Sequence, residues 1–409
     1  MKKYDVLILC RFFKPDRIIA AELAYETATD LLKKGLKVKV VCGQTKADFA
    51  YEDASKKDTN HDFKVRRLNY LQFSKSSKIG RIISYLAFVL AVVFNWRLLR
   101  QAKCIIVYSD PPILPVIAAL NKKIFKINFI FVSYDIFPDI PIITKHISSE
   151  KSIACKVMRA SNDFVDKNVD KIVALSSDMK YYILKSRQYI SEDRISVIPN
   201  WSTLGNVNFS SGIENNEIKA LRKQFELIIL YSGNMGIAHD MDTILDAAKH
   251  LRANKKVLFI FAGTGQKVNK IKVAIDDSSL NNVRLYGYLE GPDYIDMLKI
   301  ADVHVISLIN GIAGMIVPSK TYSYMSIGRP LIAILPEHTD IAKDIKHYEL
   351  GCVVASGDIA KFVKYVEYLL KDMSEVARIG NRVLEVFNDK YTREINTTKY
   401  YELVKEITS

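Results

Sequence analysis

The segment 317–334, VPSKTYSYMSIGRPLIAI, contains one helix and the strand that follows it in the predicted fold. Pro318 precedes a helical stretch that ends at Gly328, and a short apolar strand follows over 331–334. Proline near the start of a helix and glycine just after its end are common boundary signals. A helix that leads directly into a short apolar strand is typical of βαβ units.

The start of this helix also predicts an anion site. Ser319 and Lys320 stand at its N-terminus. Free backbone N–H groups and the positive end of the helix dipole favour a phosphate there, and the lysine adds a full charge. We therefore expect a diphosphate group as the ligand.

Apolar runs rich in valine and isoleucine alternate with helical patterns on both sides of this segment, which indicates parallel sheets covered on both faces. In the first half we predict strands at 4–10, 37–42, 63–68, 104–108, 128–133, 171–175 and 195–198. In the second half we predict strands at 227–232, 257–262, 283–286, 303–307, 331–334 and 352–354. The predicted fold class is α/β, with two doubly wound Rossmann-like domains in tandem.

The length of 409 residues also favours two domains, since one core rarely serves more than about 250–300 residues. We predict a first domain over 1–199 and a polar linker over 200–216, followed by a second domain over 217–388. A C-terminal helix over 389–409 carries apolar residues that can return to the first domain. Ligands of open α/β sheets bind beyond the carboxyl ends of the strands, so two such domains suit two substrates in a shared cleft.

The net charge of +14 lies entirely in the first half. Residues 1–200 hold 34 Lys and Arg against 20 Asp and Glu, whereas residues 201–409 hold 25 of each. An anionic membrane surface or a polyanion would be attracted to that half. Nucleic acid is not expected as a partner, because zinc-finger spacing, an RNP-like string and a long basic run are all missing from the sequence.

The cysteines are scattered without CxxC spacing, which favours reduced, buried thiols in the cytoplasm. The apolar stretch at the N-terminus is too short for a signal peptide. The segment 82–96, IISYLAFVLAVVFNW, is flanked by cations on both sides but falls short of the roughly 20 apolar residues that a spanning helix needs. It fits either a buried core helix or a helix resting in a membrane interface.

Three loops of the second half are expected to meet at one edge of its sheet. The first follows strand 227–232, the second follows strand 257–262, and the third leads from strand 303–307 to Ser319 and Lys320. Glycines in the first two let backbone N–H groups approach an anion. The residues that we expect to bind there are Gly233, Asn234, Gly236, His239, Thr264 and Gly265.

The runs YSGNMGIAHDMDTILDAA, FIFAGTGQ and PSKTYSYMSIGRPLIA closely resemble the donor-binding domain of family 4 glycosyltransferases. SDPPILPVIAA, VSYDIFPD and VIPNW in the first half resemble the acceptor-domain motifs of the bacterial branch that builds capsule, exopolysaccharide and O-antigen repeats. The resemblance covers nearly the whole chain.

This resemblance implies a GT-B fold, a UDP-sugar or GDP-sugar donor held by the second domain, and transfer with retention of anomeric configuration. It implies no metal. Lys320 and Ser319 would stabilise the departing diphosphate together with the loop amides. Tyr288 would lie near the nucleobase, and His239 would contact a donor phosphate or sugar hydroxyl. Asp240 and Asp242 imitate the DxD metal motif of another glycosyltransferase fold, but acids at a helix start interact with its dipole, so we expect no metal site there.

The sequence departs from the family pattern at several places. Asn234 and His239 stand where many members carry Arg and Lys, and Met315 and Ser323 stand where they carry two glutamates. We keep Ser323 among the donor-binding candidates. A glycine pair after the first strand is also missing. A catalytically inactive, glycosyltransferase-like partner subunit is therefore an alternative, and a sugar-nucleotide epimerase of the same fold is a third.

Candidates for the acceptor side follow two strands of the first half. Asp135 is expected to contact the acceptor hydroxyl or act as base, although a helix or turn cap is an equal alternative. Ser109, Pro112 and Asp139 would shape the acceptor mouth, although a purely structural turn over 109–112 is an equal alternative. Together these features predict sugar transfer to a membrane-anchored, polyprenyl diphosphate-linked saccharide in cell-surface polysaccharide biosynthesis, by a cytoplasmic enzyme peripheral to the inner face of the membrane.

Overall fold

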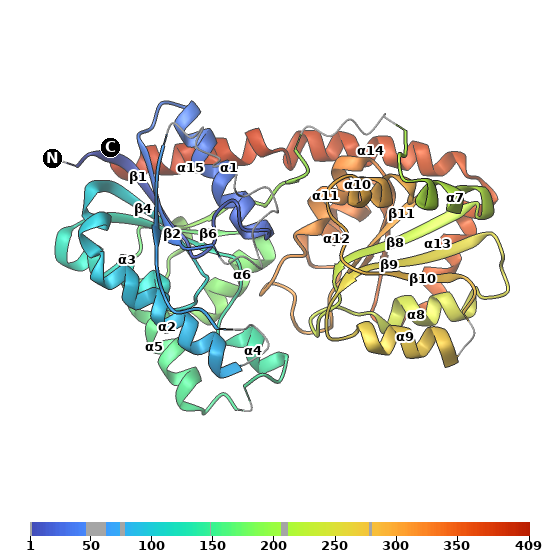
Figure 1. The fold of residues 1–409 in the computed structure, drawn as a ribbon, viewed down its shortest axis with the longest axis horizontal. Coiled ribbons are helices and arrows are strands. Elements are labelled where there is room, and N and C mark those ends of the chain that lie inside the picture. The colour runs from blue at the N-terminus through green and yellow to red at the C-terminus, as the bar shows by residue number, and fades with distance from the viewer. Residues whose placement is uncertain (1, 46–62, 74–77, 148, 206–211, 278–279) are drawn as a thin grey trace. The chain divides into compact units, whose positions relative to one another are not determined.

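The computed structural model describes residues 2–45, 63–73, 78–147, 149–205, 212–277 and 280–409 (Figure 1). These residues form two compact units. Unit 1 comprises Met1–Thr203, Gly314–Val317 and Arg393–Ser409, and unit 2 comprises Leu204–Ala313 and Pro318–Thr392. Unit 1 thus includes two segments from the second half of the chain, namely the C-terminal helix and a four-residue piece just before Pro318.

Unit 1 is built on a parallel sheet of seven strands in the order β3-β2-β1-β4-β5-β6-β7. Their bounds are β1 Tyr4–Leu9, β2 Val38–Gly43, β3 Lys64–Leu68, β4 Ala102–Tyr108, β5 Asn128–Ser133, β6 Lys171–Ala174 and β7 Ile195–Val197. The strands β2, β4 and β5 are almost entirely buried, as the apolar runs predicted, and among their residues only Lys103 is exposed. The edge strand β3 instead exposes Lys64 and Arg66, so only one of its faces is covered.

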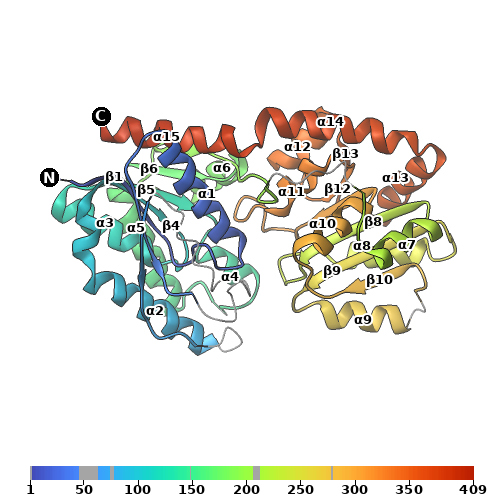
Figure 2. The same cartoon turned by 45° about the horizontal axis from the view of Figure 1, so that its top comes forward.

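Helices cover both faces of this sheet. α1 (Ile19–Lys33) packs against α15 (Arg393–Thr408), and α3 (Leu114–Phe125) packs against α2 (Lys78–Phe94) and α5 (Ile153–Asn168), as Figures 1 and 2 show. The remaining helical pieces of unit 1 are η2 Trp96–Gln101, α4 Asp139–Ile143, α6 Ser177–Ser186 and η3 Glu192–Arg194. Tyr400, Leu403 and Val404 of α15 are part of the hydrophobic core of unit 1.

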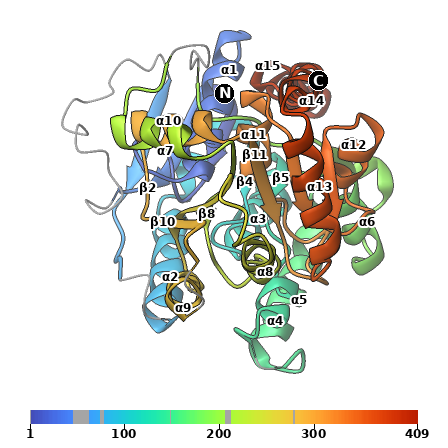
Figure 3. The same cartoon turned by 90° about the vertical axis from the view of Figure 1, so that its right-hand side faces the viewer.

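Unit 2 has a parallel sheet of six strands in the order β10-β9-β8-β11-β12-β13. The bounds are β8 Leu227–Asn234, β9 Val257–Thr264, β10 Val283–Tyr286, β11 Val303–Ser307, β12 Leu331–Ile334 and β13 Gly351–Val354. α8 (Asp242–His250) contacts α13 (Ile359–Lys371), whereas α10 (Gly291–Ile300) contacts α7 (Asn216–Gln224) and α11 (Lys320–Ile327) (Figure 3). The other helices are α9 Val268–Asp277, α12 Asp340–His347 and α14 Ser374–Lys390. The prediction of two doubly wound α/β sheets is confirmed.

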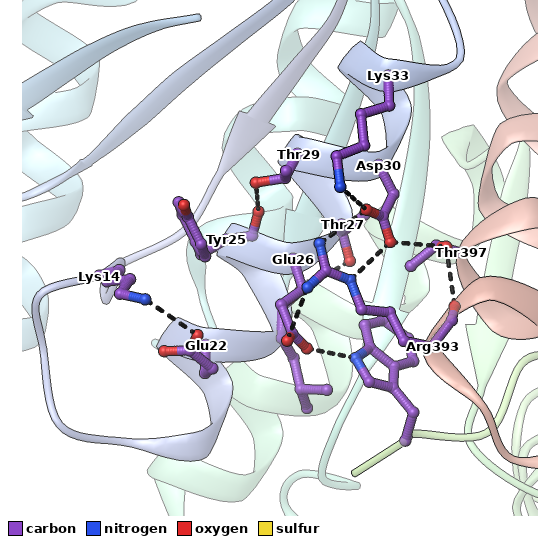
Figure 4. A network of polar contacts seen from close by, with 12 residues as sticks. Lys14, Glu22, Tyr25, Glu26, Thr27, Thr29, Asp30, Lys33, Arg393 and Thr397 are labelled. Carbon is purple, nitrogen blue, oxygen red and sulfur yellow. Dashed lines mark hydrogen bonds and ion pairs between the residues drawn. The ribbon is translucent and has the colours of Figure 1, made fainter. Parts of the chain in front are cut away.

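A charged cluster attaches the C-terminal helix to α1 inside unit 1 (Figure 4). Arg393 donates to both oxygens of Asp30 at 2.7 Å and to Glu26 at 3.0 Å. The indole N–H of Trp201 donates to the other oxygen of Glu26. Burial raises the pKa of Glu26, while Trp201 and Arg393 act in the opposite direction. The ends of two chain segments that lead to unit 2 are therefore fixed at one carboxylate.

The segment predicted as a linker over 200–216 is polar in sequence, but its ends belong to the folded units. Trp201 is buried in the unit 1 core. Asn215 caps α7 in unit 2, and its backbone N–H donates to Asp296. The burial of Trp201 and the capping of α7 by Asn215 thus make both ends of the predicted linker parts of the folded units.

The apolar segment 82–96 forms most of α2 and is neither fully buried nor fully exposed. Phe88 and Val92 face the core, whereas Ile82, Leu90 and Phe94 are 57%, 54% and 83% exposed. Within the described residues, no helix has the length and apolar character needed to cross a membrane. All five cysteines are free thiols, and Cys352 alone among them is partly exposed.

Candidate functional site

The strand order of unit 2 reverses direction between β8 and β11. In open α/β sheets, the crevice beyond the carboxyl ends of strands at such a switch point is the usual ligand site. β8 pairs with β11 only at Ile229 and Leu230, so the last residues of β8 diverge from β11. The end of β8 and the N-terminus of α11 are both located at this switch point.

Lys320 is the first residue of α11, and its side chain lies directly over Gly233 at the end of β8. A Cβ at Gly233 would lie 2.2 Å from Lys320 Cε and 2.8 Å from its Nζ. Gly233 also has a φ of 127°, which side chains rarely adopt. Glycine at this position is what allows the ammonium group to lie at the switch point, and the structure brings these two predicted residues together.

Two tyrosines hold this arrangement. The Tyr294 ring centroid lies 5.1 Å from Lys320 Nζ, and its hydroxyl lies 3.4 Å from that nitrogen. The buried Tyr324 hydroxyl accepts a hydrogen bond from the Ser232 N–H and donates to the Ser232 carbonyl, both at 2.9 Å. Tyr324 therefore supplies the hydrogen bonds that a neighbouring strand would otherwise give to β8 where the strands diverge.

The loops after β8 and β9 touch backbone to backbone. The Met235 N–H donates to Thr264 O at 2.7 Å, and the Lys267 N–H donates to Met235 O at 2.9 Å. A Cβ at Gly265 would lie 2.4 Å from the Met235 carbonyl carbon, so this contact requires glycine. Lys267 Nζ donates to His239 O and brings a second ammonium group to these loops.

His239 is held as a neutral imidazole. Its Nδ1 lies 2.8 Å from Ser307 O, an acceptor, so Nδ1 carries the proton. Burial lowers its pKa, and the charges of Lys267 and Lys320 lower it further. Nε2 is then an acceptor, which suits a sugar hydroxyl better than a phosphate. The neutral imidazole does not replace the cation that the family pattern places here.

The other donor-side candidates occupy the same edge of the unit 2 sheet. Ser319 is the N-cap residue of α11 without a side-chain cap, and Ser323 is buried on its first turn. The Asn234 amide folds over Gly236, whose Cβ would lie 3.1 Å from Asn234 Nδ2. Tyr288 follows β10 and is 62% exposed.

Asp240 and Asp242 have partners in the protein. Asp240 accepts hydrogen bonds from Thr243 and Ser356, and these bonds lower its pKa against the effect of burial. Asp242 pairs with Lys270 at 2.6 Å. Among the residues that the structure describes, no group of three His, Cys, Asp or Glu side chains is suited to hold a metal ion.

In unit 1, Asp135 follows β5 and pairs with the segment 314–317. Asp135 and Ile316 form an antiparallel bridge, and the Ile136 N–H donates to Met315 O at 3.0 Å. Burial and then the nearby Asp110 charge raise the pKa of Asp135 to about 6. A carboxylate with this pKa is mostly ionised at neutral pH and is a better proton acceptor than an ordinary aspartate.

The remaining acceptor-side candidates have structural partners. Ser109 is buried and accepts a hydrogen bond from the Tyr134 N–H at 3.1 Å, which joins the ends of β4 and β5. Pro112 is partly exposed in the turn before α3. Asp139 begins α4 and pairs with Arg159 at 3.4 Å. Ser109 and Asp139 therefore shape this edge whatever they bind.

Three residues of the unit 2 edge are not apparent from the sequence. Tyr294 on α10 contacts Lys320, Tyr324 on α11 contacts Ser232, and Lys267 after β9 contacts His239. In the sequence, tyrosines on a helix resemble core residues, and a single lysine after a glycine loop resembles a surface residue. Only their contacts with β8, its loop or Lys320 in the folded structure distinguish them from ordinary core and surface residues.

Two family models match the chain. The model described as Glycosyltransferase Family 4 matches residues 20–202, and the model described as Glycosyl transferases group 1 matches residues 213–385. The two matches do not overlap, and each lies largely within one of the two units.

Curated relatives and solved structures agree with these matches. The glycosyltransferase WbjE of Pseudomonas aeruginosa is 22% identical over 346 residues, which is 83% of this chain and 84% of that protein. The colanic acid biosynthesis glycosyl transferase WcaI of Escherichia coli K12 is 23% identical over 181 residues, 43% of either chain. HepE of Anabaena, solved with UDP, has 13% identity and a TM-score of 0.70, and the match covers 98% of this chain and 100% of that chain. The sucrose-phosphate synthase of Thermosynechococcus elongatus has 13% identity and a TM-score of 0.72, with 98% and 99% coverage.

Proposed function

Because the chain belongs to the family 4 glycosyltransferases of the GT-B fold, we propose that it transfers a sugar, with retention of configuration, from a nucleoside diphosphate sugar to a lipid-linked saccharide. The observation that carries the proposal is the Lys320 ammonium held over Gly233 at the switch point of unit 2. The similarity to WcaI, a colanic acid biosynthesis glycosyl transferase, favours a role in polysaccharide biosynthesis.

Unit 2 would bind the donor. Lys320, the N-terminus of α11 and the β8 and β9 loops offer positive charge and backbone N–H groups to a diphosphate. When the bond between the anomeric carbon and the diphosphate oxygen breaks, negative charge grows on that oxygen. Lys320 would stabilise this charge, and neutral His239 would accept a hydrogen bond from a sugar hydroxyl. HepE was solved with UDP, which supports a uridine nucleotide, with GDP as the alternative.

Unit 1 would bind the acceptor. In the proposed step, the acceptor oxygen forms a bond to the anomeric carbon as the diphosphate leaves. The proton of the acceptor hydroxyl passes to Asp135, whose raised pKa suits a proton acceptor. Asp135 is thus the proposed base. Lys320 and Asp135 would thus supply the charges for departure of the diphosphate and for removal of the acceptor proton, and we propose no metal.

The exposed face of α2 supports a membrane-bound acceptor. Ile79, Ile82, Leu86, Leu90 and Phe94 follow one another at helical spacing and are all exposed. Arg97 and Arg100 follow immediately and are also exposed. An apolar face beside cations suits the interface of an anionic bilayer, and we propose a peripheral location on the inner face of the cell membrane.

Nucleotide release tests the proposed activity. The purified protein, incubated with separate UDP-sugars and GDP-sugars, should release nucleoside diphosphate slowly from one donor and faster when membrane extract is added. Lys320→Ala should lower that rate by about 10²-fold or more, as the loss of one oxyanion-stabilising donor does. Release from no donor would favour the inactive partner subunit, and a changed nucleotide sugar without release would favour the epimerase.

A further inference from the structure

Arg11 in unit 1 is placed and bound in a way that the proposed base and donor site do not explain. It follows β1, and Asp110 follows β4, and these are the two strands between which the order of the unit 1 sheet reverses. Its side chain is only 10% exposed. A buried guanidinium at a switch point indicates a ligand-binding residue, because such a charge is costly to bury without an anionic partner.

The neighbours of Arg11 orient its side chain but neutralise it only in part. Nε donates to the Tyr70 hydroxyl at 3.1 Å, and the Phe12 and Tyr85 rings lie 4.7 and 4.8 Å from the guanidinium carbon. Asp110 is the charged partner, but Nη1 lies 3.9 Å from its oxygen, beyond hydrogen-bond distance, and that carboxylate is 37% exposed. The two groups therefore form an ion pair without a hydrogen bond, for which a phosphate oxygen can compete.

The backbone around Arg11 is also adapted to this arrangement. The Gly43 N–H donates to Arg11 O at 3.0 Å. A Cβ at Gly43 would lie 2.8 Å from that oxygen and 2.8 Å from Tyr70 Cε1. The absence of a side chain at the end of β2 lets Tyr70 reach Arg11, so the guanidinium is held before any ligand binds.

Tyr85 connects this guanidinium to the exposed apolar face. Tyr85 lies on α2, next to Leu86 on the face that Ile82, Leu86 and Leu90 expose. One helix thus places an aromatic ring against Arg11 and apolar side chains toward the surroundings. A lipid phosphate has the same arrangement, because its charged group is bonded directly to an apolar chain. Its phosphate would contact Arg11 while its chain contacts the exposed face of α2.

We propose that Arg11 binds the diphosphate of a lipid-linked acceptor in unit 1. This assignment rests on the proposed function, because it names the part of the acceptor that the same site holds. The planar guanidinium presents paired N–H donors to phosphate oxygens, which makes arginine the preferred residue for this contact.

Binding of geranyl diphosphate, measured calorimetrically with the donor site filled by excess UDP, tests the assignment. Arg11→Gln should weaken binding by about 10- to 100-fold, the usual loss for a charge-assisted contact. Arg66→Gln is the matched control, since it removes the same charge from an exposed position on the edge strand β3, away from the exposed face of α2, and should change binding less than twofold. Equal losses in the two variants, or no loss in Arg11→Gln, would overturn the proposal.

Two further variants keep the test decisive if Arg11→Gln folds poorly. Tyr70→Phe retains the ring but removes the partner of Nε, and should weaken binding by a few-fold. Asp110→Asn removes the competing carboxylate and should strengthen binding by a few-fold. A purely structural pairing of Arg11 with Asp110 predicts the opposite sign for Asp110→Asn, which would overturn the proposal.

The source of the phosphate is separated by three probes. Geranyl diphosphate should bind more tightly than pyrophosphate, and geraniol should not distinguish wild type from Arg11→Gln. Wild type and Arg11→Gln should bind equally well to vesicles that contain anionic phospholipid. Weaker vesicle binding by Arg11→Gln would assign the site to a phospholipid headgroup and overturn the proposal. Failure of nucleotide release with Arg11-dependent binding intact would refute only the transferase activity, and the reverse result would refute only this site.

Discussion

Replacement of Gly233 by alanine should displace the Lys320 ammonium from the end of β8. The added Cβ would lie 2.2 Å from Lys320 Cε, far inside contact distance. Because the clash is with the flexible end of a lysine rather than with backbone, the lysine would move and the sheet would remain. The positive φ of Gly233 adds local strain of about 1–3 kcal/mol.

The expected loss of activity follows from the role of Lys320. If the ammonium stabilises the departing diphosphate, its displacement should lower kcat about 10²-fold, or roughly 2.7 kcal/mol of transition-state stabilisation. Lys320→Ala should cause a similar loss. The double variant should also lose about 10²-fold rather than 10⁴-fold, because both changes remove the same contact.

Nucleoside diphosphate release by the wild type, both single variants and the double variant completes this cycle. Thermal unfolding of each protein provides the control for strain. Additive losses in the double variant would show that Gly233 acts independently of Lys320, and the reasoning from their contact would then be refuted.

Three further predictions concern other parts of the protein. Asp135→Asn should abolish transfer, and wild-type kcat/KM should fall as pH drops below about 6, where Asp135 becomes protonated. A raised carboxyl pKa means that ionisation of Asp135 is unfavourable in the folded state. The free energy of unfolding of Asp135→Asn should therefore exceed that of wild type by about 2–3 kcal/mol at pH 8 and equal it near pH 3. A lower value for the variant at pH 8 would contradict this. Tyr324→Phe should lose about 1–3 kcal/mol of unfolding free energy in denaturant titrations, because the Ser232 backbone loses its partner at the switch point, and unchanged stability would argue against that pairing. Leu90→Glu should reduce co-sedimentation with anionic vesicles and leave nucleotide release from the donor unchanged. The control Val92→Ala, on the buried side of α2, should keep vesicle binding. If Leu90→Glu binds vesicles as well as wild type does, α2 is not part of the membrane contact.

The strands were predictable because parallel strands covered on both faces are continuous apolar runs. Three strand ends differ from the prediction by two residues: the start of β4 and two ends at the site. The predicted strands 227–232 and 257–262 continue to Asn234 and Thr264, and Gly233 pairs with Gly263. Glycine weakens the sequence signal of a strand, yet it permits the close backbone contact that the two loops need.

The grouping of Lys320 with Gly233 was also within reach of the sequence, since both follow strands that meet at one edge. Arg11 was not, because its contacts are Tyr70, Tyr85 and Asp110, all far away in the chain. The protonation state of His239 depends in the same way on Ser307 O, which only the folded structure brings near. Local patterns predict elements, whereas long-range contacts decide what the side chains at their ends can do.

The backbone pairing of Asp135 with the segment 314–317 has a consequence for the path of the chain. Only Pro318 and Ser319 separate this segment from Lys320. Asp135, the proposed base, is thus paired through its backbone with a segment that reaches Lys320 after two further residues. Because Ile316 belongs to unit 1 and Lys320 to unit 2, the chain passes from the backbone partner of the proposed base to the proposed anion-stabilising group within this short connection.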